Sequence, residues 1–371
     1  MKYINILIFL FFYQSIFADG TIDSSKPKYF STSQDIIDNC KIMSIKKNDN
    51  KEIGIDKIYT CVENFTDFNL YHENIEYLHN SLNQIINIYG EDSLEVKFLY
   101  LKLALAYMYV DKKNIASSLF EYVEQSKENT KYENNLLLIV KIFNTKAIYY
   151  SLTQEIDKSR NMYKKALYYQ KKYKGKVSRN YVILLSLLAL LESNNNNTKQ
   201  AITYIDEIRD IFRKNTLNME NSARIEILMN MGRVYYGNKD FNKSKTIYFV
   251  ALEVIKSKNI IHPIAIELLS ELVSSLIRSN DERDYIASKM ACEIALDIQK
   301  NIQYKDNLII ANIYLVEAQY DYISKDYKKS KEHFEKALLI IKKLKLDKKQ
   351  KEDFIYTIEK SLKELEGNIR I

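Results

Sequence analysis

The sequence predicts an all-α protein built from about six helix-turn-helix repeats, with a helical cap at each end. Two observations carry this prediction. The chain has only 7 Gly and 2 Pro among 371 residues, too few for the many tight turns of a β-sandwich or barrel. Landmark residues also recur at a nearly constant spacing along most of the chain, which is the signature of a helical solenoid.

The repeat is marked by residues that are mostly small, separated by steps of 43, 42, 43, 44 and 42 positions. These landmarks are Ala104, Ala147, Ala189, Gly232, Leu276 and Ala318. In the clearest copies a serine follows twelve positions later, as Ser159, Ser244 and Ser330. We expect the landmark on one helix and the serine on the next, because only small residues fit where two helices cross closely.

Short polar turns separate the two helices of each repeat, for example GNKD at 237–240 and SNNNNT at 193–198. Asn and Gly suit such turns because they tolerate left-handed backbone angles. Asp240, Asp326 and Thr198 are placed to cap the second helix of their repeats.

This pattern resembles the tetratricopeptide repeat family, whose unit is a helix-turn-helix with such small and aromatic positions. The step near 43 is longer than the usual unit of about 34 residues. The run Ala251, Leu252, Ile255, His262 and Pro263 is similar to the helix end and His-Pro connector of kinesin light chain repeats. The resemblance covers roughly residues 90–345 and implies a right-handed superhelical solenoid that serves as a binding scaffold.

The N-terminal stretch MKYINILIFLFFYQSIFA has the layout of a secretory signal peptide that is cleaved after Ala18, with an uncleaved anchor as the alternative. The expected location is therefore periplasmic or secreted. The chain is predicted to divide into five parts. They are a signal peptide (1–18), an N-terminal extension (19–62), a capping helix (63–92), the repeat array (93–345) and a second capping helix (346–371).

Cysteine content and charge restrict the other possibilities. Cys40 and Cys61 form a disulfide candidate in an exported protein, with two free thiols in the extension as the alternative. Cys292 falls on an apolar helical face and is expected in the core. The formal charge of +7 is spread over a long surface and does not indicate nucleic-acid binding. No second long apolar run exists, so no stable membrane insertion is expected after cleavage.

Residues 229–252 superficially resemble a phosphate-binding loop, because Gly232 and Gly237 have the G-x-x-x-x-G spacing and Lys239 follows. A P-loop needs Lys directly after the second glycine, then Ser or Thr, with a strand before it. Here Asn238 intervenes. We therefore interpret Gly232 as a helix-crossing residue and Gly237 as part of a turn.

No motif predicts a catalytic, metal or cofactor site. His72, Glu76 and His79 share a helical face, but their order is not H-E-x-x-H, and a solvated surface is favoured over zinc binding. His333 is interpreted as a solvated helix residue. The six lysines within 342–351 are interpreted as a solvated junction, with contact to an acidic partner or lipid as the alternative. The chain is not expected to be an enzyme.

Function is therefore assigned to a groove lined by the first helix of each repeat. Resemblance to the family places these residues there: Phe98, Leu101, Leu105, Met108, Tyr109, Asn144, Ile148, Met229, Arg233, Tyr236, Asn312, Leu315, Gln319 and Tyr322. The alternative is that neighbouring helices cover these positions and make them core. The hypothesis is a non-catalytic scaffold or adaptor that binds a protein or peptide. A peptide-sensing module and an assembly factor for a cell-envelope complex are the other candidates.

Overall fold

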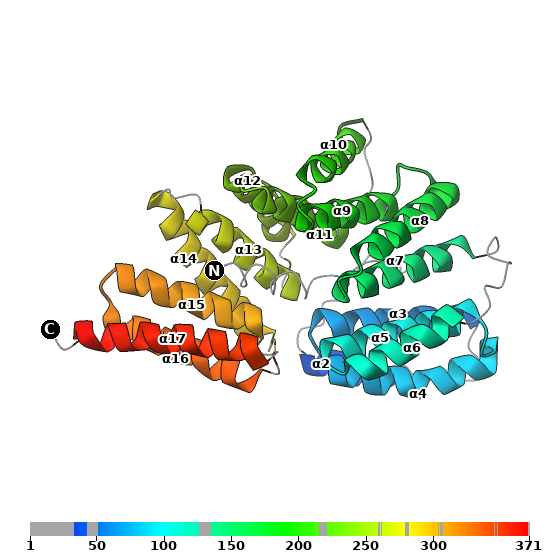
Figure 1. The fold of residues 1–371 in the computed structure, drawn as a ribbon, viewed down its shortest axis with the longest axis horizontal. Helices are drawn as coiled ribbons and strands as arrows, with labels where there is room; N and C mark the ends of the chain where they lie inside the picture. Colours follow the sequence, from blue (N-terminus) through cyan, green and yellow to red (C-terminus); the bar gives the residue numbers. More distant parts are fainter. Residues whose placement is uncertain are drawn as a thin grey trace. The chain divides into compact units, whose positions relative to one another are not determined.

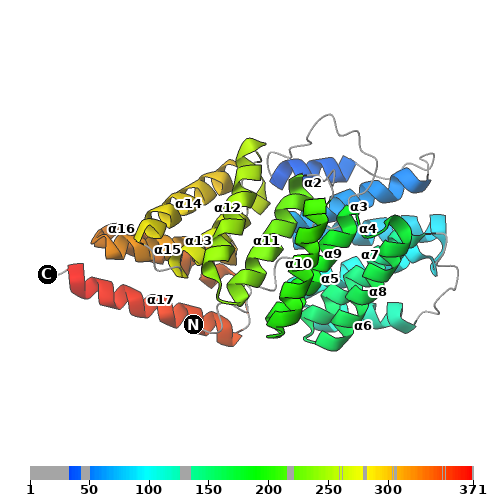
Figure 2. The ribbon, with the colours of Figure 1, turned by 90° about the horizontal axis from the view of Figure 1, so that it is seen from above.

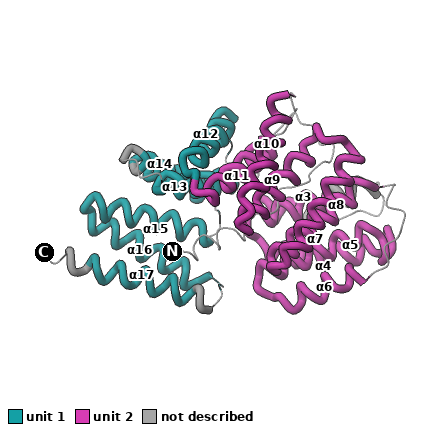
Figure 3. The backbone as a smooth tube through the Cα atoms, turned by 45° about the horizontal axis from the view of Figure 1, so that its top comes forward, with its two compact units in different colours: residues 1–11, 240–371 teal, residues 12–239 magenta. Residues whose placement is uncertain are grey.

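The computed structural model describes residues 33–42, 51–125, 135–214, 221–258, 260, 262–278, 282–302, 304, 307–344, 346 and 348–369. These described residues form 16 helices, α2 to α17, and no strand (Figure 1). The all-α prediction is therefore confirmed. The helices belong to two compact units, divided between Lys239 and Asp240 (Figure 3). The segment predicted as a signal peptide lies outside the described residues.

Each unit is a succession of helices joined by short connections. Unit 2 contains α2 (Ser33–Ile42), α3 (Lys51–Asp67), α4 (Tyr71–Tyr89), α5 (Leu94–Tyr109), α6 (Lys113–Gln125), α7 (Leu136–Leu152), α8 (Ile156–Lys174), α9 (Arg179–Asn194), α10 (Thr198–Lys214) and α11 (Asn221–Gly237). Unit 1 contains α12 (Phe241–Ser257), α13 (Pro263–Arg278), α14 (Glu282–Asn301), α15 (Leu308–Ile323), α16 (Tyr327–Lys343) and α17 (Lys348–Ile369).

Consecutive helices pack in pairs, and the pairs stack within each unit. The helical hairpins are α5–α6, α7–α8 and α9–α10 in unit 2, and α13–α14 and α15–α16 in unit 1. First helices also contact each other, α5 with α7, α9 with α11, and α13 with α15. In Figure 2 the helices α7, α8, α9 and α10 run side by side within unit 2. This is the repeat packing that the spacing predicts.

The landmark residues occupy the helix crossings. All of them are buried, as are the small residues twelve positions later: Ala104, Ala147, Ala189, Gly232, Leu276 and Ala318, then Ala116, Ser159, Ala201, Ser244, Ser288 and Ser330. In two hairpins the serine also joins its helices. The Ser159 hydroxyl donates to the Ala147 carbonyl oxygen at 2.8 Å, and Ser330 donates to Ala318 at 2.7 Å. The serines are therefore hydrogen-bond donors as well as small residues.

The repeat that contains Gly232 departs from this arrangement. Its two helices, α11 and α12, belong to different units, because the division falls in the turn between them. The hydroxyl of Ser244 on α12 lies 2.8 Å from the hydroxyl of Ser275 on α13. In this repeat the serine therefore joins α12 to α13 instead of to α11, which the repeat spacing does not predict.

We expect Ser159→Ala to lower the free energy of unfolding of unit 2 by about 1 kcal/mol, the usual net contribution of one hydrogen bond. The effect stays small because the Ala147 carbonyl keeps its helical partner. Urea denaturation followed by circular dichroism measures the difference. The matched control is Ser118→Ala, since the exposed Ser118 hydroxyl donates only to Asn114 of its own helix. Equal losses in both variants would contradict an interhelical role for Ser159.

Several turns place residues in the left-handed backbone conformation although their side-chain type does not favour it. Positive φ occurs at Asp111, Gln154, Asn196, Lys239 and Lys325, at one equivalent position in five turns, with φ between 59° and 64°. Of these residues, Asn196 and Asp111 are types that adopt this conformation more readily, whereas Gln154, Lys239 and Lys325 are not. In the turns at Gln154 and Lys325 the flanking helices pack together as hairpins, so helix packing overrides the local preference of the residue.

Gly237 corrects one of the sequence interpretations. It is the last residue of α11 and is not the left-handed residue of the turn. A Cβ at this position would lie 2.8 Å from the Ser193 hydroxyl oxygen. The glycine therefore permits close approach between α11 and α9. Because α11 runs without a break through Gly232, the stretch is structural, as predicted.

Helix capping agrees with the sequence at two of three positions. Asp240 and Asp326 accept hydrogen bonds from the backbone N–H groups of Lys243 and Lys329. Thr198 is not a cap, because it is the first residue of α10. In the His-Pro connector, the His262 Nδ1 accepts from the Ile264 backbone N–H at 3.2 Å. This bond ties the connector to the first turn of α13.

The predicted N-terminal extension is helical where it is described. Helix α2 packs on α3, and the disulfide between Cys40 and Cys61 joins them with 5.7 Å between Cα atoms. The predicted pairing is therefore confirmed. Helix α3 continues through the boundary expected after residue 62, and α4 follows it. At the other end α17 packs on α16. Within the described part of the chain, every helix is too short or too polar to cross a membrane.

Candidate functional site

Helix α3 lies against the first helices of unit 2, where a bound peptide was predicted. The Tyr59 ring meets the Phe98 ring of α5 edge to face, with 4.9 Å between centroids. The Lys141 Nζ of α7 lies 4.6 Å from the centre of the Tyr59 ring. Cation–π and edge-to-face aromatic contacts of this kind are common in binding interfaces. The chain therefore places one of its own helices on this face.

Charge complementarity accompanies this contact. Glu63 of α3 forms a 2.6 Å ion pair with Lys102 of α5, and both side chains are almost fully buried. Burial raises the pKa of Asp67 well above its usual range, and the nearby carboxylates of Glu63 and Glu226 raise it further. Glu226 is on α11, so carboxylates of both α3 and α11 act on Asp67.

The predicted groove residues of unit 2 are buried or partly buried. Seven are buried, Phe98, Leu101, Leu105, Asn144, Ile148, Met229 and Arg233, and three are partly buried, Met108, Tyr109 and Tyr236. Tyr109 stacks on Tyr71 of α4 at 4.8 Å. Inside the face, Arg233 donates to the Asn230 side chain, which donates to Ser186. Covering by the chain's own helices is the alternative that the sequence left open.

The equivalent positions of α15 in unit 1 are more accessible. Asn312 and Leu315 are partly buried, and Gln319 and Tyr322 are exposed, Tyr322 to 41%. In α5 the residues at the corresponding registers are Phe98, Leu101, Leu105 and Met108. Leu105, which corresponds to Gln319, is only 1% exposed. At this register the last repeat therefore exposes a position that the first repeat buries.

A second apolar surface lies on α14. Ile286, Met290 and Ile294 follow one another at intervals of four residues and are all exposed. Residues four apart share one face of a helix. This stripe is on the second helix of its hairpin, so it is separate from the predicted groove face. Contiguous exposed apolar residues mark surfaces for protein contact.

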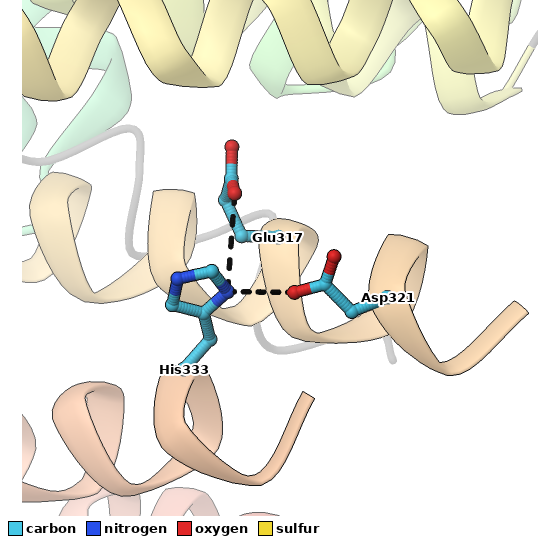
Figure 4. A group of neighbouring side chains, drawn as sticks. All are labelled: Glu317, Asp321 and His333. Atoms are coloured by element: carbon cyan, nitrogen blue, oxygen red, sulfur yellow. Dashed lines mark hydrogen bonds and ion pairs between the residues drawn. The ribbon is translucent and has the colours of Figure 1, made fainter. Parts of the chain in front are cut away.

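One group of ionisable side chains assembles in unit 1 without any prediction from the sequence. Glu317 and Asp321 of α15 lie near His333 of α16 (Figure 4). The His333 Nδ1 is 2.9 Å from Asp321 Oδ2 and 3.8 Å from Glu317 Oε2. Both carboxylates are buried, and the imidazole is partly buried. His333 is therefore not the solvated residue that the sequence suggested.

Electrostatics at this cluster favour an added positive charge. Burial raises the pKa of Glu317 to about 7, and the carboxylates of Asp321 and Glu293 contribute to the rise. Lys289 and Lys336 act in the opposite direction. The sequence contained one usable signal, since Glu317 and Asp321 are four residues apart. Nothing local indicated that His333 would join them from the next helix.

The other sequence candidates remain structural. His72 and His79 are both exposed, and the His79 Nε2 lies 2.8 Å from the Tyr107 hydroxyl. Within the lysine-rich segment, the Lys351 ammonium donates to the carbonyl oxygens of Lys342 and Leu344, at 2.7 and 2.8 Å. These two bonds connect α17 to the end of α16, which favours a structural junction.

Comparisons with known proteins identify the fold. No family model matches the chain, and no curated protein matches it. Among solved structures, it is similar to a tetratricopeptide repeat protein from Parabacteroides merdae, with 12% identity, a TM-score of 0.45, and coverage of 82% of this chain and 98% of the other. It is similar to a Rap protein in complex with competence and sporulation factor, with 12% identity, a TM-score of 0.52, and coverage of 90% and 91%.

Yeast Tom70 is a further structural neighbour, with 13% identity, a TM-score of 0.50, and coverage of 91% of this chain and 70% of Tom70. At such identities the likeness concerns the fold alone. It agrees with the period near 43 residues, the buried landmark residues and the stacked hairpins. The chain therefore has a tetratricopeptide-type, all-α helical-repeat fold.

Proposed function

We propose that this protein is an exported, non-catalytic scaffold or adaptor that binds an amphipathic helical segment of a partner protein on the first-helix face of unit 1. The observation that carries the proposal is the difference between equivalent registers. Leu105 of α5 is buried, whereas Gln319 at the equivalent register of α15 is exposed, and Tyr322 of α15 is exposed as well. Repeat proteins use this face for recognition because stacking leaves it continuous across several repeats.

Helix α3 supports the choice of a helical ligand. It is an amphipathic segment held on first helices by aromatic, cation–π and ion-pair contacts. A helix that lays its apolar face on a helical surface is a common recognition mode. The Cys40–Cys61 disulfide supports export, since disulfides persist in oxidising compartments.

The test is capture on immobilised chain 19–371, with chemical crosslinking and mass spectrometry to identify both the partner and the crosslinked residues. The test variant is the double substitution Gln319→Glu and Tyr322→Glu, which adds charge to exposed positions without disturbing the core. We expect a partner that wild type retains to be lost by this variant, with crosslinks mapping to α15.

Two control variants locate the surface. Tyr356→Glu changes an exposed tyrosine of α17 and is expected to leave capture unchanged. Met290→Glu interrupts the apolar stripe of α14 and tests the rival surface. Loss of the partner with Met290→Glu alone, and retention by the α15 variant, would contradict the proposal and move the binding site to α14. Circular dichroism verifies that all three variants keep their helicity.

A further inference from the structure

We propose that Glu317, Asp321 and His333 form a binding site for a divalent transition-metal cation of the Zn²⁺ class. The ligands are one oxygen from each carboxylate and the Nδ1 of the imidazole. The site is independent of the surface proposed for partner binding, because none of these three residues belongs to that surface.

The hairpin between α15 and α16 holds the three side chains in place. Glu317 and Asp321 are separated by one helical turn, so they share a face of α15. His333 lies three residues after Ser330, whose hydroxyl bond to the Ala318 carbonyl fixes the crossing of the two helices. The ligands therefore come from a rigid pair of helices, which is the arrangement that precise metal sites require.

The distances match the size of a single cation. The three candidate ligand atoms all lie within 4.8 Å of one another. Around Zn²⁺, ligands at about 2.1 Å in tetrahedral geometry are about 3.4 Å apart. The distances from His333 Nδ1 to Asp321 Oδ2 and Glu317 Oε2, 2.9 and 3.8 Å, fall on either side of that value. Small side-chain adjustments would therefore complete the coordination.

An independent observation comes from the Glu317 carboxylate. Glu317 is 5% exposed, and its Oε1 has no hydrogen-bond partner among the described residues. A buried polar atom without a partner is unfavourable, more so when the group is charged. In Figure 4 the carboxylate projects from α15 beside the imidazole, with one oxygen toward the ring and the other away from it. A cation would compensate this carboxylate.

The charged groups around the cluster are compatible with a bound cation. Glu293 of α14 adds a third carboxylate, and Lys289 and Lys336 supply two ammonium groups. Lys289 lies 4.0 Å from Glu293, and its Nζ is 4.6 Å from the Tyr320 ring. The Lys336 Nζ lies 5.4 Å from the Tyr314 ring. With the imidazole neutral and the carboxylates ionised, as metal ligation requires, three carboxylates face two lysines, so one negative charge remains for a cation to balance.

The donor set selects the class of metal. Imidazole suits Zn²⁺, Cu²⁺, Ni²⁺ and Fe²⁺, whereas Mg²⁺ and Ca²⁺ prefer oxygen ligands alone. Two carboxylates and one histidine form a three-ligand set, which leaves a fourth tetrahedral position open. We therefore expect Zn²⁺ and Co²⁺ to bind and Mg²⁺ and Ca²⁺ not to compete at similar concentrations.

The experiment is a Zn²⁺ titration of tag-free chain 19–371 against a chromophoric chelator, with Co²⁺ absorption as a report of coordination geometry. Wild type is expected to bind one equivalent of Zn²⁺. Glu317→Gln and His333→Gln are expected to weaken binding at least about tenfold, since even outer-shell substitutions reach that size. The control His72→Gln removes an exposed histidine elsewhere and is expected to bind like wild type.

A second measurement needs no variant. The chain has four histidines, so the imidazole ¹⁵N spectrum of wild type is simple to assign. Zn²⁺ is expected to shift the Nδ1 resonance of His333 and to leave those of His72 and His262 in place. An unshifted His333, or equal Zn²⁺ affinity in wild type and His333→Gln, would overturn the proposal. The cluster would then be an ion pair between Asp321 and His333 beside a neutral Glu317.

Discussion

Replacing Lys102 with Met is expected to lower the free energy of unfolding of unit 2 by about 3 to 5 kcal/mol. The Lys102 and Glu63 side chains are only 8% and 12% exposed, and their charged atoms are 2.6 Å apart. Burial raises the pKa of Glu63, and Lys102 is the main influence that lowers it. Without Lys102, Glu63 must stay charged without its partner or take up a proton, and either outcome destabilises the folded state.

Urea denaturation followed by circular dichroism measures this effect. The double variant Lys102→Met, Glu63→Met is expected to recover most of the loss, because replacing both ions with apolar side chains leaves no buried charge. The control is Lys176→Met, which breaks a 3.1 Å ion pair with Glu207 between side chains that are more exposed. That change is expected to cost less than about 1 kcal/mol. Similar losses for Lys102→Met and Lys176→Met would show that α3 does not bury its charge on α5.

Removing the disulfide with Cys40→Ala and Cys61→Ala is expected to cost about 3 kcal/mol. The bond joins residues 21 positions apart, and a loop of this length loses about that much entropy in the unfolded chain. Because the bridge is the covalent link between α2 and α3, we also expect faster amide hydrogen exchange in α2 than in wild type.

Two comparisons isolate the contribution of the bond. Wild type in the presence of a reductant is expected to have nearly the same free energy of unfolding as the double variant. The remaining difference is the packing of the two thiols, which the variant lacks. Cys292→Ala removes a buried thiol outside the disulfide and reports the cost of cavity formation alone. Equal stability of the oxidised and reduced wild-type protein would contradict the expected stabilisation.

The sequence predicts the helical pairs well because their signal is local and repeated. A residue such as Ala147 must be small wherever two helices cross, and Ser159 must follow at a fixed distance because the turn has a fixed length. The residue types in the turns are a weaker guide. Gln154 and Lys325 adopt left-handed angles in turns between packed helices. Gly237, which the sequence assigned to a turn, is the last residue of α11.

Accessibility is not predictable from the register alone. Leu105 and Gln319 stand at the same position of their repeats, yet the first is buried and the second exposed. In unit 2, α3 contacts α5 at Phe98 and Lys102, and α7 at Lys141. Helix α3 lies outside the repeat pattern, and no local feature of residues 51–67 indicates where that helix packs.

The sequence by itself determined the all-α class, the repeat period and the small residues at the crossings, and it offered the pairing of Cys40 with Cys61 as one of two alternatives. The period and the crossing residues depend on spacing along one chain. Only the tertiary structure decided which first helices are covered, and that His333 meets Glu317 and Asp321. Those contacts join side chains from different helices, and their geometry depends on how the helices pack against each other.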